Sequence, residues 1–306
     1  MGDIKLFRIT ASGAVELAGQ TATIEKSLQT MMERHLEELL GIRFLATEYT
    51  TGKRHNGRID TLGIDENNSP VIIEYKRTTN ENVMNQGLYY LDWLMDHQAE
   101  FTLLVQKRFG VEAADAIDWS APRLLCIAGG FTKYDEYAVQ QINRNIELYT
   151  YKKFGEELFL LDLVNATTAS PSTASAETAS NSKGNSKNSK TVSDYLAQAS
   201  EELTNLYEDL KAFILAIGDD VQLNILQDYI AFKRIKNFAC VEIHPQKKAI
   251  TVFVKVDPSS IELKPGFTRD VRNIGHFGTG DLEITIMTTD HLEEARSLIQ
   301  QSYEMN

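Results

Sequence analysis

Cysteine is scarce in this 306-residue sequence, which contains only Cys126 and Cys240. Each lies inside an apolar, strand-like run, so we expect both to be buried core thiols. Two isolated cysteines exclude a disulfide framework and a cysteine-based zinc site, because both of these need several cysteines at short spacings.

Long apolar runs are also lacking. No stretch of about 18 uncharged apolar residues, the length needed to span a bilayer, occurs in the chain. The first residues, MGDIKLFRITASG, place acidic and basic side chains where the apolar core of a secretory signal would lie. The sequence therefore predicts no membrane association and a cytoplasmic location.

The sequence also lacks an excess of basic residues. The 31 Lys and Arg residues are outnumbered by 43 Asp and Glu residues, which gives a formal net charge of −12. Residues 1–165 and 193–306 each carry a net charge of −7, so neither segment is basic. Tight, sequence-blind DNA binding through bulk positive charge is therefore not expected.

What is present is the composition of two folded domains and a linker. The apolar share of 42% and the charged share of 24% are typical of soluble globular proteins. Large apolar residues vanish from 166–191, where Ser, Thr, Ala, Asn and Lys predominate. We predict an N-terminal domain at 1–165, a flexible linker at 166–191 and a C-terminal domain at 192–306.

The N-terminal domain shows the element order of a mixed sheet with helices on both faces. Apolar residues at helical spacing predict a helix over Thr21–Leu40, closed by Gly41. Strands and helices then follow in the order β, β, β, α, β, which indicates an α/β fold. The predicted strands are Ile4–Thr10, Ala14–Ala18, Arg43–Thr50, Gly57–Ile64, Pro70–Lys76, Arg123–Ala128, Ile146–Tyr151 and Leu158–Val164, and the further helices are Glu81–His97, Ala99–Phe109 and Tyr134–Asn143.

The C-terminal domain is predicted to be a small α+β unit. One amphipathic helix is expected over Val192–Ile217, and a closing helix over Asp290–Tyr303 with Asp290 as its N-cap. Three strand-like runs lie between the helices: Ala239–His244, Ala249–Val256 and Asp281–Met287.

Chemistry is concentrated in the passage Gly57–Arg77. If its two strands form a hairpin, Asp60 and Glu74 lie close across the pair, and Lys76 shares a strand face with Glu74. The second strand is otherwise apolar on both faces. A Glu and a Lys within it are costly unless they pair or bind something, so they mark a candidate site.

Two carboxylates and a backbone carbonyl form the hard-oxygen environment that Mg²⁺ or Mn²⁺ prefers. We expect Asp60, Glu74 and the carbonyl of Tyr75 as ligands, with Lys76 orienting or activating a water molecule. The alternative is a cross-strand ion pair at a sheet edge, and the spacing alone does not separate the two.

These residues resemble the D-x(n)-E-x-K signature of the PD-(D/E)XK nuclease superfamily. Two passages are similar to those that begin and end the metal-binding hairpin of NucS-type and restriction-type endonucleases. They are Gly57-Arg58-Ile59-Asp60 and Ile73-Glu74-Tyr75-Lys76-Arg77. The resemblance implies a restriction-endonuclease-like fold over about 21–164 and metal-dependent hydrolysis of DNA. A separate N-terminal DNA-binding domain like that of the NucS group is not evident, so substrate choice does not carry over.

Two further features of that superfamily have matches here. Glu25 matches a glutamate of the first helix that supports the metal, although a first-turn glutamate also suits the helix dipole. Gln86 and Tyr90 match a Q-x-x-x-Y pattern on the helix after the E-x-K strand; an ordinary core aromatic is the alternative interpretation of the tyrosine. Arg58 and Arg77 are candidate phosphate contacts or plain surface charge.

The C-terminal half resembles a small domain of unknown function found behind nuclease-like domains, in proteins some of which are labelled predicted transport proteins. The resemblance lies in Thr268–Ile286 and in the preceding FACVEIHPQKKAITVFVKV. Its glycine-rich segment IGHFGTGDLE is either a bulged turn or a pocket that binds an anion. The basic cluster Lys233, Arg234 and Lys236 is a weak nucleic-acid signal or a solvated helix end.

Two functions from different classes follow. The first is a Mg²⁺- or Mn²⁺-dependent nuclease acting on DNA, with Asp60, Glu74, Lys76, Glu25 and Gln86 in its catalytic site. The second is a non-catalytic adaptor or regulator of nuclease fold, whose C-terminal domain contacts a protein partner. A transport-associated function ranks last, and the oligomeric state stays open, with a dimer compatible with the sequence.

Overall fold

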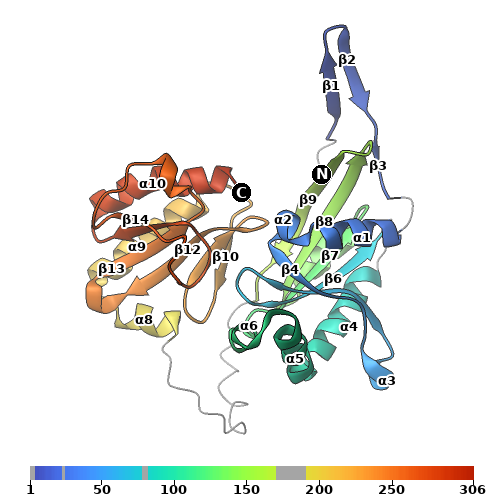
Figure 1. Ribbon diagram of the computed structural model, residues 1–306, viewed down its shortest axis with the longest axis horizontal. Helices are drawn as coiled ribbons and strands as arrows, with labels where there is room; N and C mark the ends of the chain where they lie inside the picture. Colours follow the sequence, from blue (N-terminus) through green and yellow to red (C-terminus); the bar gives the residue numbers. More distant parts are fainter. Residues whose placement is uncertain (1–3, 23–24, 78–81, 170–190) are drawn as a thin grey trace. The chain divides into compact units, whose positions relative to one another are not determined.

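The computed structural model describes residues 4–22, 25–77, 82–169 and 191–306. The chain divides into two compact units, Met1–Ser170 and Pro171–Asn306 (Figure 1). Strand β9 of the first unit runs to Thr167, so the linker predicted from residue 166 begins two residues too early. The rest of that predicted linker, at 170–190, lies outside the described residues.

A mixed sheet forms the centre of the N-terminal unit, as predicted, and it has seven strands. Strands β4, β5 and β6 are antiparallel, β6, β7 and β8 are parallel, and β9 returns antiparallel to β8. The short strand β3 pairs with the end of β8. The strands are β3 (Gly19–Gln20), β4 (Ile42–Thr50), β5 (Arg58–Asp65), β6 (Pro70–Lys76), β7 (Arg123–Ala128), β8 (Asn145–Phe154) and β9 (Leu158–Thr167).

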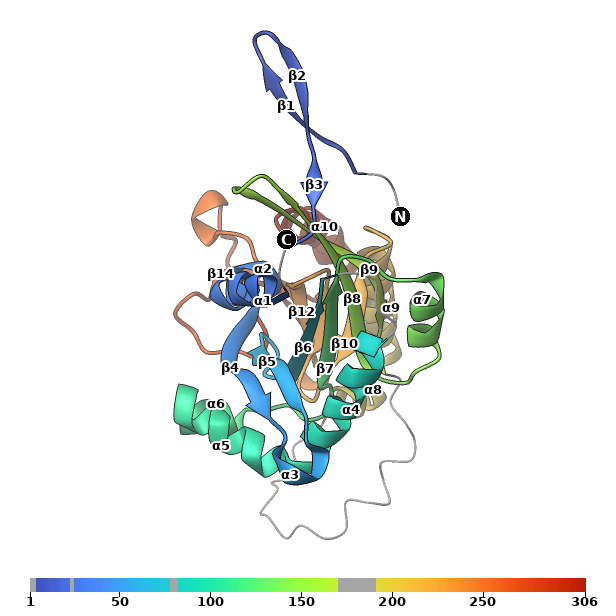
Figure 2. The same ribbon diagram turned by 90° about the vertical axis from the view of Figure 1, so that its right-hand side faces the viewer.

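Helices cover both faces of this sheet (Figure 2). Helix α4 (Asn82–Asp96) lies against β6 and β7, and Gly87 allows the close approach, because a Cβ there would lie 2.5 Å from Leu124 Cδ1. Thr61 bonds to Glu33 of α1, whereas its neighbour Leu62 packs with the side chains of α4. Since neighbouring strand residues point to opposite faces, α1 covers the other face.

The helix predicted over Thr21–Leu40 is in fact two helices, with His35 between them. Gly41 closes the second one in the left-handed conformation at φ 66°, as a C-terminal glycine does. The helices of this unit are α1 (Glu25–Arg34), α2 (Leu36–Leu40), α3 (Gly52–His55), α4, α5 (Gln98–Phe109), α6 (Val111–Asp115) and α7 (Lys133–Gln140); α3 and α6 are too short to give a periodic signal.

The predicted N-terminal hairpin forms a two-stranded sheet of its own, β1 (Leu6–Thr10) and β2 (Gly13–Leu17). In Figure 1 it stands away from the seven-stranded sheet. Its side chains are exposed except for the half-buried Leu6 and Leu17, and the exposed fraction of Ile9 reaches 77%. The hairpin therefore adds nothing to the core of the unit.

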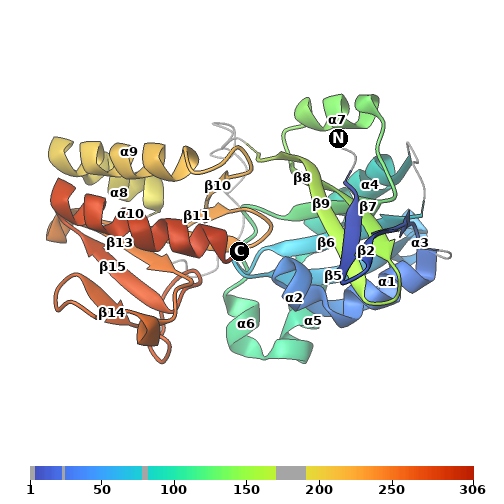
Figure 3. The same ribbon diagram turned by 90° about the horizontal axis from the view of Figure 1, so that it is seen from above.

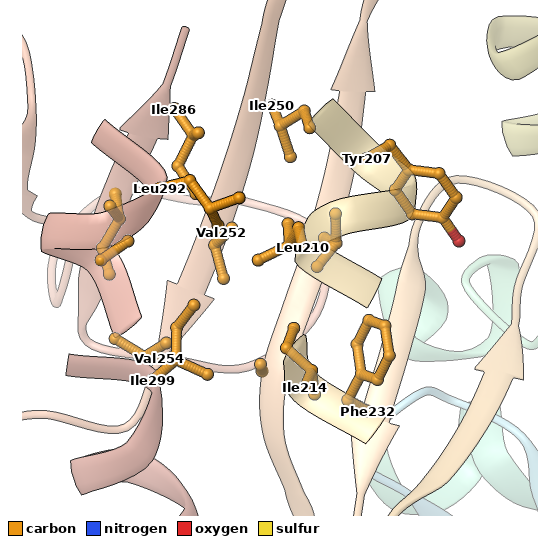
Figure 4. Close-up of a cluster of buried hydrophobic side chains, with 14 of the residues drawn as sticks. Tyr207, Leu210, Ile214, Phe232, Ile250, Val252, Val254, Ile286, Leu292 and Ile299 are labelled. Carbon is orange, nitrogen blue, oxygen red and sulfur yellow. The ribbon is translucent and has the colours of Figure 1, made fainter. Parts of the chain in front are cut away.

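The C-terminal unit is a six-stranded antiparallel sheet in the order β10-β11-β12-β13-β15-β14. Helices α9 and α10 lie along one face of it (Figure 3), and their apolar side chains pack with those of the strands (Figure 4). The elements are α8 (Val192–Gln198), α9 (Glu201–Leu215), β10 (Gln222–Ile225), β11 (Ile230–Lys233), β12 (Asn237–His244), η1 (Pro245–Lys247), β13 (Ala249–Val254), η2 (Pro258–Ser260), β14 (Thr268–Asp270), β15 (Leu282–Ile286) and α10 (Thr289–Glu304).

Three details of this unit correct the sequence predictions. The helix expected over Val192–Ile217 is broken before α9, where the Ser200 side chain accepts from the Leu203 N–H as an N-cap. Thr288, not Asp290, caps α10 by accepting from the His291 N–H. Lys233 does not lie at a solvated helix end, because it is the last residue of β11 and is buried.

A buried ion cluster ties the N-terminal strands together at one end of the sheet. Arg123, the first residue of β7, donates to Asp65 at 2.8 Å and twice to Glu147 at 2.9 Å. Tyr149 donates a further bond of 2.7 Å to Glu147, and all four side chains are shielded from solvent. One arginine thus balances two carboxylates away from water.

Replacing Arg123 by methionine should destabilise the N-terminal unit by about 3–5 kcal/mol, because two buried carboxylates lose their counter-charge. Urea unfolding followed by tryptophan fluorescence measures this unit alone, since Trp93 and Trp119 both belong to it. The matched control is Lys5→Ala, which removes an exposed ion pair with Glu16 and should cost about 1 kcal/mol or less. Equal effects of the two changes would contradict this interpretation.

Candidate active site

The β5–β6 hairpin brings Asp60 and Glu74 into direct contact. The strand ladder runs from Ile64 opposite Pro70 to Thr61 opposite Ile73. Next to its last pair, the Asp60 N–H donates to Glu74 Oε1 at 3.1 Å, and the Tyr75 N–H donates to Asp60 Oδ2 at 3.0 Å. The two carboxylates therefore brace the end of the hairpin and stand beside one another.

Burial makes this pair of carboxylates electrostatically unusual. Glu74 is completely buried, and its Oε2 atom has no hydrogen-bond partner among the described residues. Loss of solvation, and then the negative charge of Asp60, raise the pKa of Glu74 from its ordinary 4.5 to about 9. Burial also raises the pKa of Asp60, although the bond from the Tyr75 N–H opposes the shift. The pair favours a bound proton or another cation.

Lys76 and Glu25 complete one side of the site. The Lys76 ammonium lies 3.2 Å from Glu25 Oε1, and the lysine side chain is only 18% exposed. Glu25 is the first residue of α1, so the helix start places its carboxylate over the end of β6. The predicted Glu25 is thus at the site, in contact with the lysine.

Helix α4 supplies the other side. Gln86 Nε2 donates to the Tyr90 hydroxyl at 3.2 Å, and the Arg58 N–H donates to the same hydroxyl at 3.1 Å. A Cβ at Gly57 would lie 2.5 Å from Tyr90 Cε1, so this close approach requires glycine. Packing against Tyr90 therefore explains why glycine stands at the start of the hairpin motif.

These side chains surround one open cavity of about 660 Å³. Six of the predicted site residues line it, and Glu74 lies buried beneath them. The lining residues are Glu25, Thr50, Gly52, Asn56, Gly57, Arg58, Asp60, Lys76, Gln86 and Tyr90.

Two predicted residues do not face the cavity. The Tyr75 side chain is completely buried and lies on the opposite strand face from Glu74 and Lys76. Arg77, which follows the last residue of β6, is exposed and is not among the described residues that line the cavity. The Tyr75 carbonyl as a metal ligand and Arg77 as a phosphate contact stay predictions.

Sequence reasoning missed Glu48 and Gln29. Glu48 has a φ of +51° in β4 and forms ion pairs with Lys26, at 2.9 Å, and with Arg58. The hydrogen bond from Lys26 is the main cause that lowers the pKa of Glu48. Gln29 is 3% exposed and donates to the Asp60 carbonyl at 2.7 Å. Its position four residues after Glu25 on an otherwise apolar helix face was the available signal.

The carboxylates do not form a ready-made metal cluster. Over the described ranges, no three His, Cys, Asp or Glu side chains are grouped so that they could hold one ion together. Glu25 pairs with Lys76 instead of joining Asp60 and Glu74. Protein ligands for a metal would therefore come from two side chains.

Comparison with known proteins assigns the chain to a family. A protein of Haemophilus influenzae that is described only as uncharacterized is 31% identical over 307 residues, which cover 98% of this chain and 99% of that protein. This chain belongs to the same family. Within it, residues 24–154 match the Endonuclease NucS C-terminal domain, and residues 192–306 match a Domain of unknown function (DUF5655).

Two solved structures are also similar to the family's N-terminal unit. A repair endonuclease from Pyrococcus abyssi is 19% identical, with a TM-score of 0.28, over 44% of this chain and 50% of that one. The EndoMS chain of a complex with double-stranded DNA is 18% identical, with a TM-score of 0.24, over 44% and 46%. The chain thus spans about half the length of either solved protein.

The N-terminal unit is therefore a NucS-like, nuclease-related domain with a mixed sheet between helices, which confirms the resemblance seen in the sequence. The second unit belongs to a domain family whose function is unknown. No helix of the described ranges is long and apolar enough to cross a membrane.

The raised pKa of Glu74 predicts how stability depends on pH. Without divalent cations, the folded protein keeps a proton on Glu74 that the unfolded chain releases above its ordinary pKa of 4.5. The stabilisation is complete below that pKa and is lost as the pH rises towards about 9, at up to about 1.4 kcal/mol per pH unit. The neutral variant Glu74→Gln lacks this loss, so its stability relative to wild type should rise from acid to alkaline pH.

Urea unfolding in the presence of a chelator, followed by tryptophan fluorescence at several pH values, measures this difference. Glu112→Gln, which changes an exposed glutamate of the same unit, is the control and should follow the wild type. Parallel profiles for wild type and Glu74→Gln would show that Glu74 is ionised in the folded protein.

Proposed function

We propose that the N-terminal unit is a Mg²⁺- or Mn²⁺-dependent nuclease that hydrolyses DNA phosphodiester bonds. The observation that carries the proposal is the unpartnered, buried oxygen of Glu74 beside Asp60. Glu74 is buried beside a second carboxylate, and the nearby Lys76 ammonium is itself paired with Glu25, so a divalent cation would supply further positive charge. The NucS-like family match supports the same chemistry.

The donor set suits a hard cation. Asp60 and Glu74 would hold the ion, with the Tyr75 carbonyl as a third oxygen, and Mg²⁺ characteristically takes few protein ligands and retains water. When bound, such an ion polarises a phosphoryl oxygen and lowers the pKa of a water molecule. The open cavity above Asp60 gives a phosphate room to approach.

The remaining residues would position the attacking water and the phosphate and neutralise negative charge on the phosphate. Lys76, held by Glu25 at 3.2 Å, places a positive charge beside the carboxylates, where it would orient the attacking water and offset charge on the phosphate. Gln86 and Tyr90 are joined by a hydrogen bond and offer polar groups from the opposite wall. Arg58, also a lining residue, would contact a neighbouring phosphate, as Arg77 would from outside the cavity.

The substrate contacts should be local. The chain carries a net charge of −12, so a wide electrostatic footprint on DNA is not available. A nuclease of this kind would recognise a particular DNA structure or be delivered by a partner, in keeping with a second domain that has its own compact core.

A second candidate function is a non-catalytic adaptor that keeps the nuclease fold. The Lys76–Glu25 ion pair favours it, because both groups are already satisfied by one another, as in a purely structural cluster. The protein partner would then bind through the C-terminal unit.

Cleavage assays separate the two functions. Purified protein should cut at least one of single-stranded, branched, mismatched or modified DNA with Mg²⁺ or Mn²⁺, and Lys76→Ala should lower the rate by about 100-fold or more. Lys133→Ala, an exposed lysine outside the cavity, is the matched control and should retain full activity. Absence of cutting on all substrates, or undiminished cutting by Lys76→Ala, would refute the nuclease.

Metal binding should be measurable without any substrate. Isothermal titration with Mn²⁺ is expected to show micromolar-to-millimolar binding, on the order expected for few-ligand carboxylate sites, that disappears in Asp60→Asn. Asp60 loses one charge in that variant while its size is kept. Titration without heat in the wild type would support the adaptor.

A further inference from the structure

A second cavity lies wholly within the C-terminal unit. It measures about 430 Å³, a size usual for small-ligand sites, and is found where α8, the end of β12, η1 and the loop after β14 meet. Its charged and aromatic lining residues are Tyr195, Asp228, Glu242, His244, Lys247 and Phe277, and two glutamines add further polar groups.

The loop that carries Phe277 is anchored on both sides of this residue. The His276 ring stacks on Phe253 with centroids 4.2 Å apart, and its nitrogens lie 3.0 and 3.1 Å from the carbonyl oxygens of Phe277 and Gly280. Gly278 adopts φ 75°, and a Cβ there would lie 2.6 Å from Cys240 Cβ. The glycine-rich segment is therefore a packed loop rather than an open anion cradle.

This anchoring leaves one large apolar ring in solvent. Phe277 is 55% exposed although both of its neighbours are fixed against the sheet. An exposed aromatic on an anchored stretch of backbone at a cavity is a ready contact for a ligand, because little backbone freedom is lost on binding. Tyr195 of α8 provides a second ring in the same lining.

The charges of the cavity are mainly negative. Glu242 is only 16% exposed and lies 3.3 Å from His244, and Asp228 adds a second carboxylate. Lys247, an exposed residue of η1, is the opposing charge in the lining. The surrounding segment, 193–306, carries a net charge of −7, which favours a cation over an anion.

We propose that this cavity binds an organic cation of the guanidinium or alkylammonium type. Its charge would pair with Glu242 and Asp228, and its flat or methylated surface would lie against the rings of Phe277 and Tyr195 by cation–π contact. Such a group comes either from a free small molecule or from an arginine or lysine side chain of a protein. The site does not depend on the nuclease proposal.

Titration calorimetry of the full chain with methylguanidinium and with the peptide acetyl-Gly-Arg-Gly-amide tests the site. Neutral methylurea, of nearly the same shape as methylguanidinium, is the control ligand and should bind at least about tenfold more weakly. Tighter binding of the peptide would identify a protein side chain as the source, and tighter binding of the free ion a small molecule.

Four variants test the charge that the cavity prefers and the place where the cation binds. Glu242→Gln and Phe277→Ala should each weaken methylguanidinium binding by about fivefold or more, whereas Lys247→Gln should strengthen it by removing a competing charge. Ile274→Ala, an exposed position of the same loop outside the lining, should have no effect and controls for loop damage. The proposal is overturned if neither cationic probe binds, if methylurea binds equally well, or if the charge variants act in the opposite directions.

Discussion

The placement of Asp60 beside the buried Glu74 at the end of one hairpin is the constraint on which the candidate site depends. Each carboxylate accepts a hydrogen bond from a main-chain N–H group of the neighbouring strand, which fixes its position. Loss of solvation, and then the negative charge of Asp60, raise the pKa of Glu74 to about 9. Two acids fixed in this way destabilise the folded protein unless a proton or a metal ion neutralises them.

The other elements of the N-terminal unit support this hairpin and bring further side chains to it. The parallel strands β7 and β8 support β6 from one side, and the Arg123 cluster secures the opposite end of the same strands. Helices α1 and α4 then bring Glu25, Gln86 and Tyr90 to one cavity from two directions. Glu48 and Gln29 hold Arg58 and the Asp60 main chain in place behind it. The sheet and the two helices therefore position these side chains together.

How much of this was predictable from sequence follows from the physics of each residue. Glu74 and Lys76 were identifiable because a charged residue in an apolar strand has no ordinary explanation. Glu48 was not, since an acid in a half-exposed strand is commonplace and its contact with Arg58 depends on a local φ of +51°. The short strands β10, β11 and β14 were not predicted, because three or four residues show no clear period. The break before α9 was readable from Ser200 and the glutamates after it, but the apolar pattern on both sides concealed it.

The most direct measurement is the number of protons released when the metal-free protein binds Mn²⁺. Calorimetric titration at about pH 7.5 in buffers of different ionisation enthalpy gives that number, because a metal must displace the proton that a raised pKa keeps on Glu74. Our account predicts release of about one proton in the wild type and almost none in Glu74→Gln. Binding without proton release, or no binding at all, would contradict it.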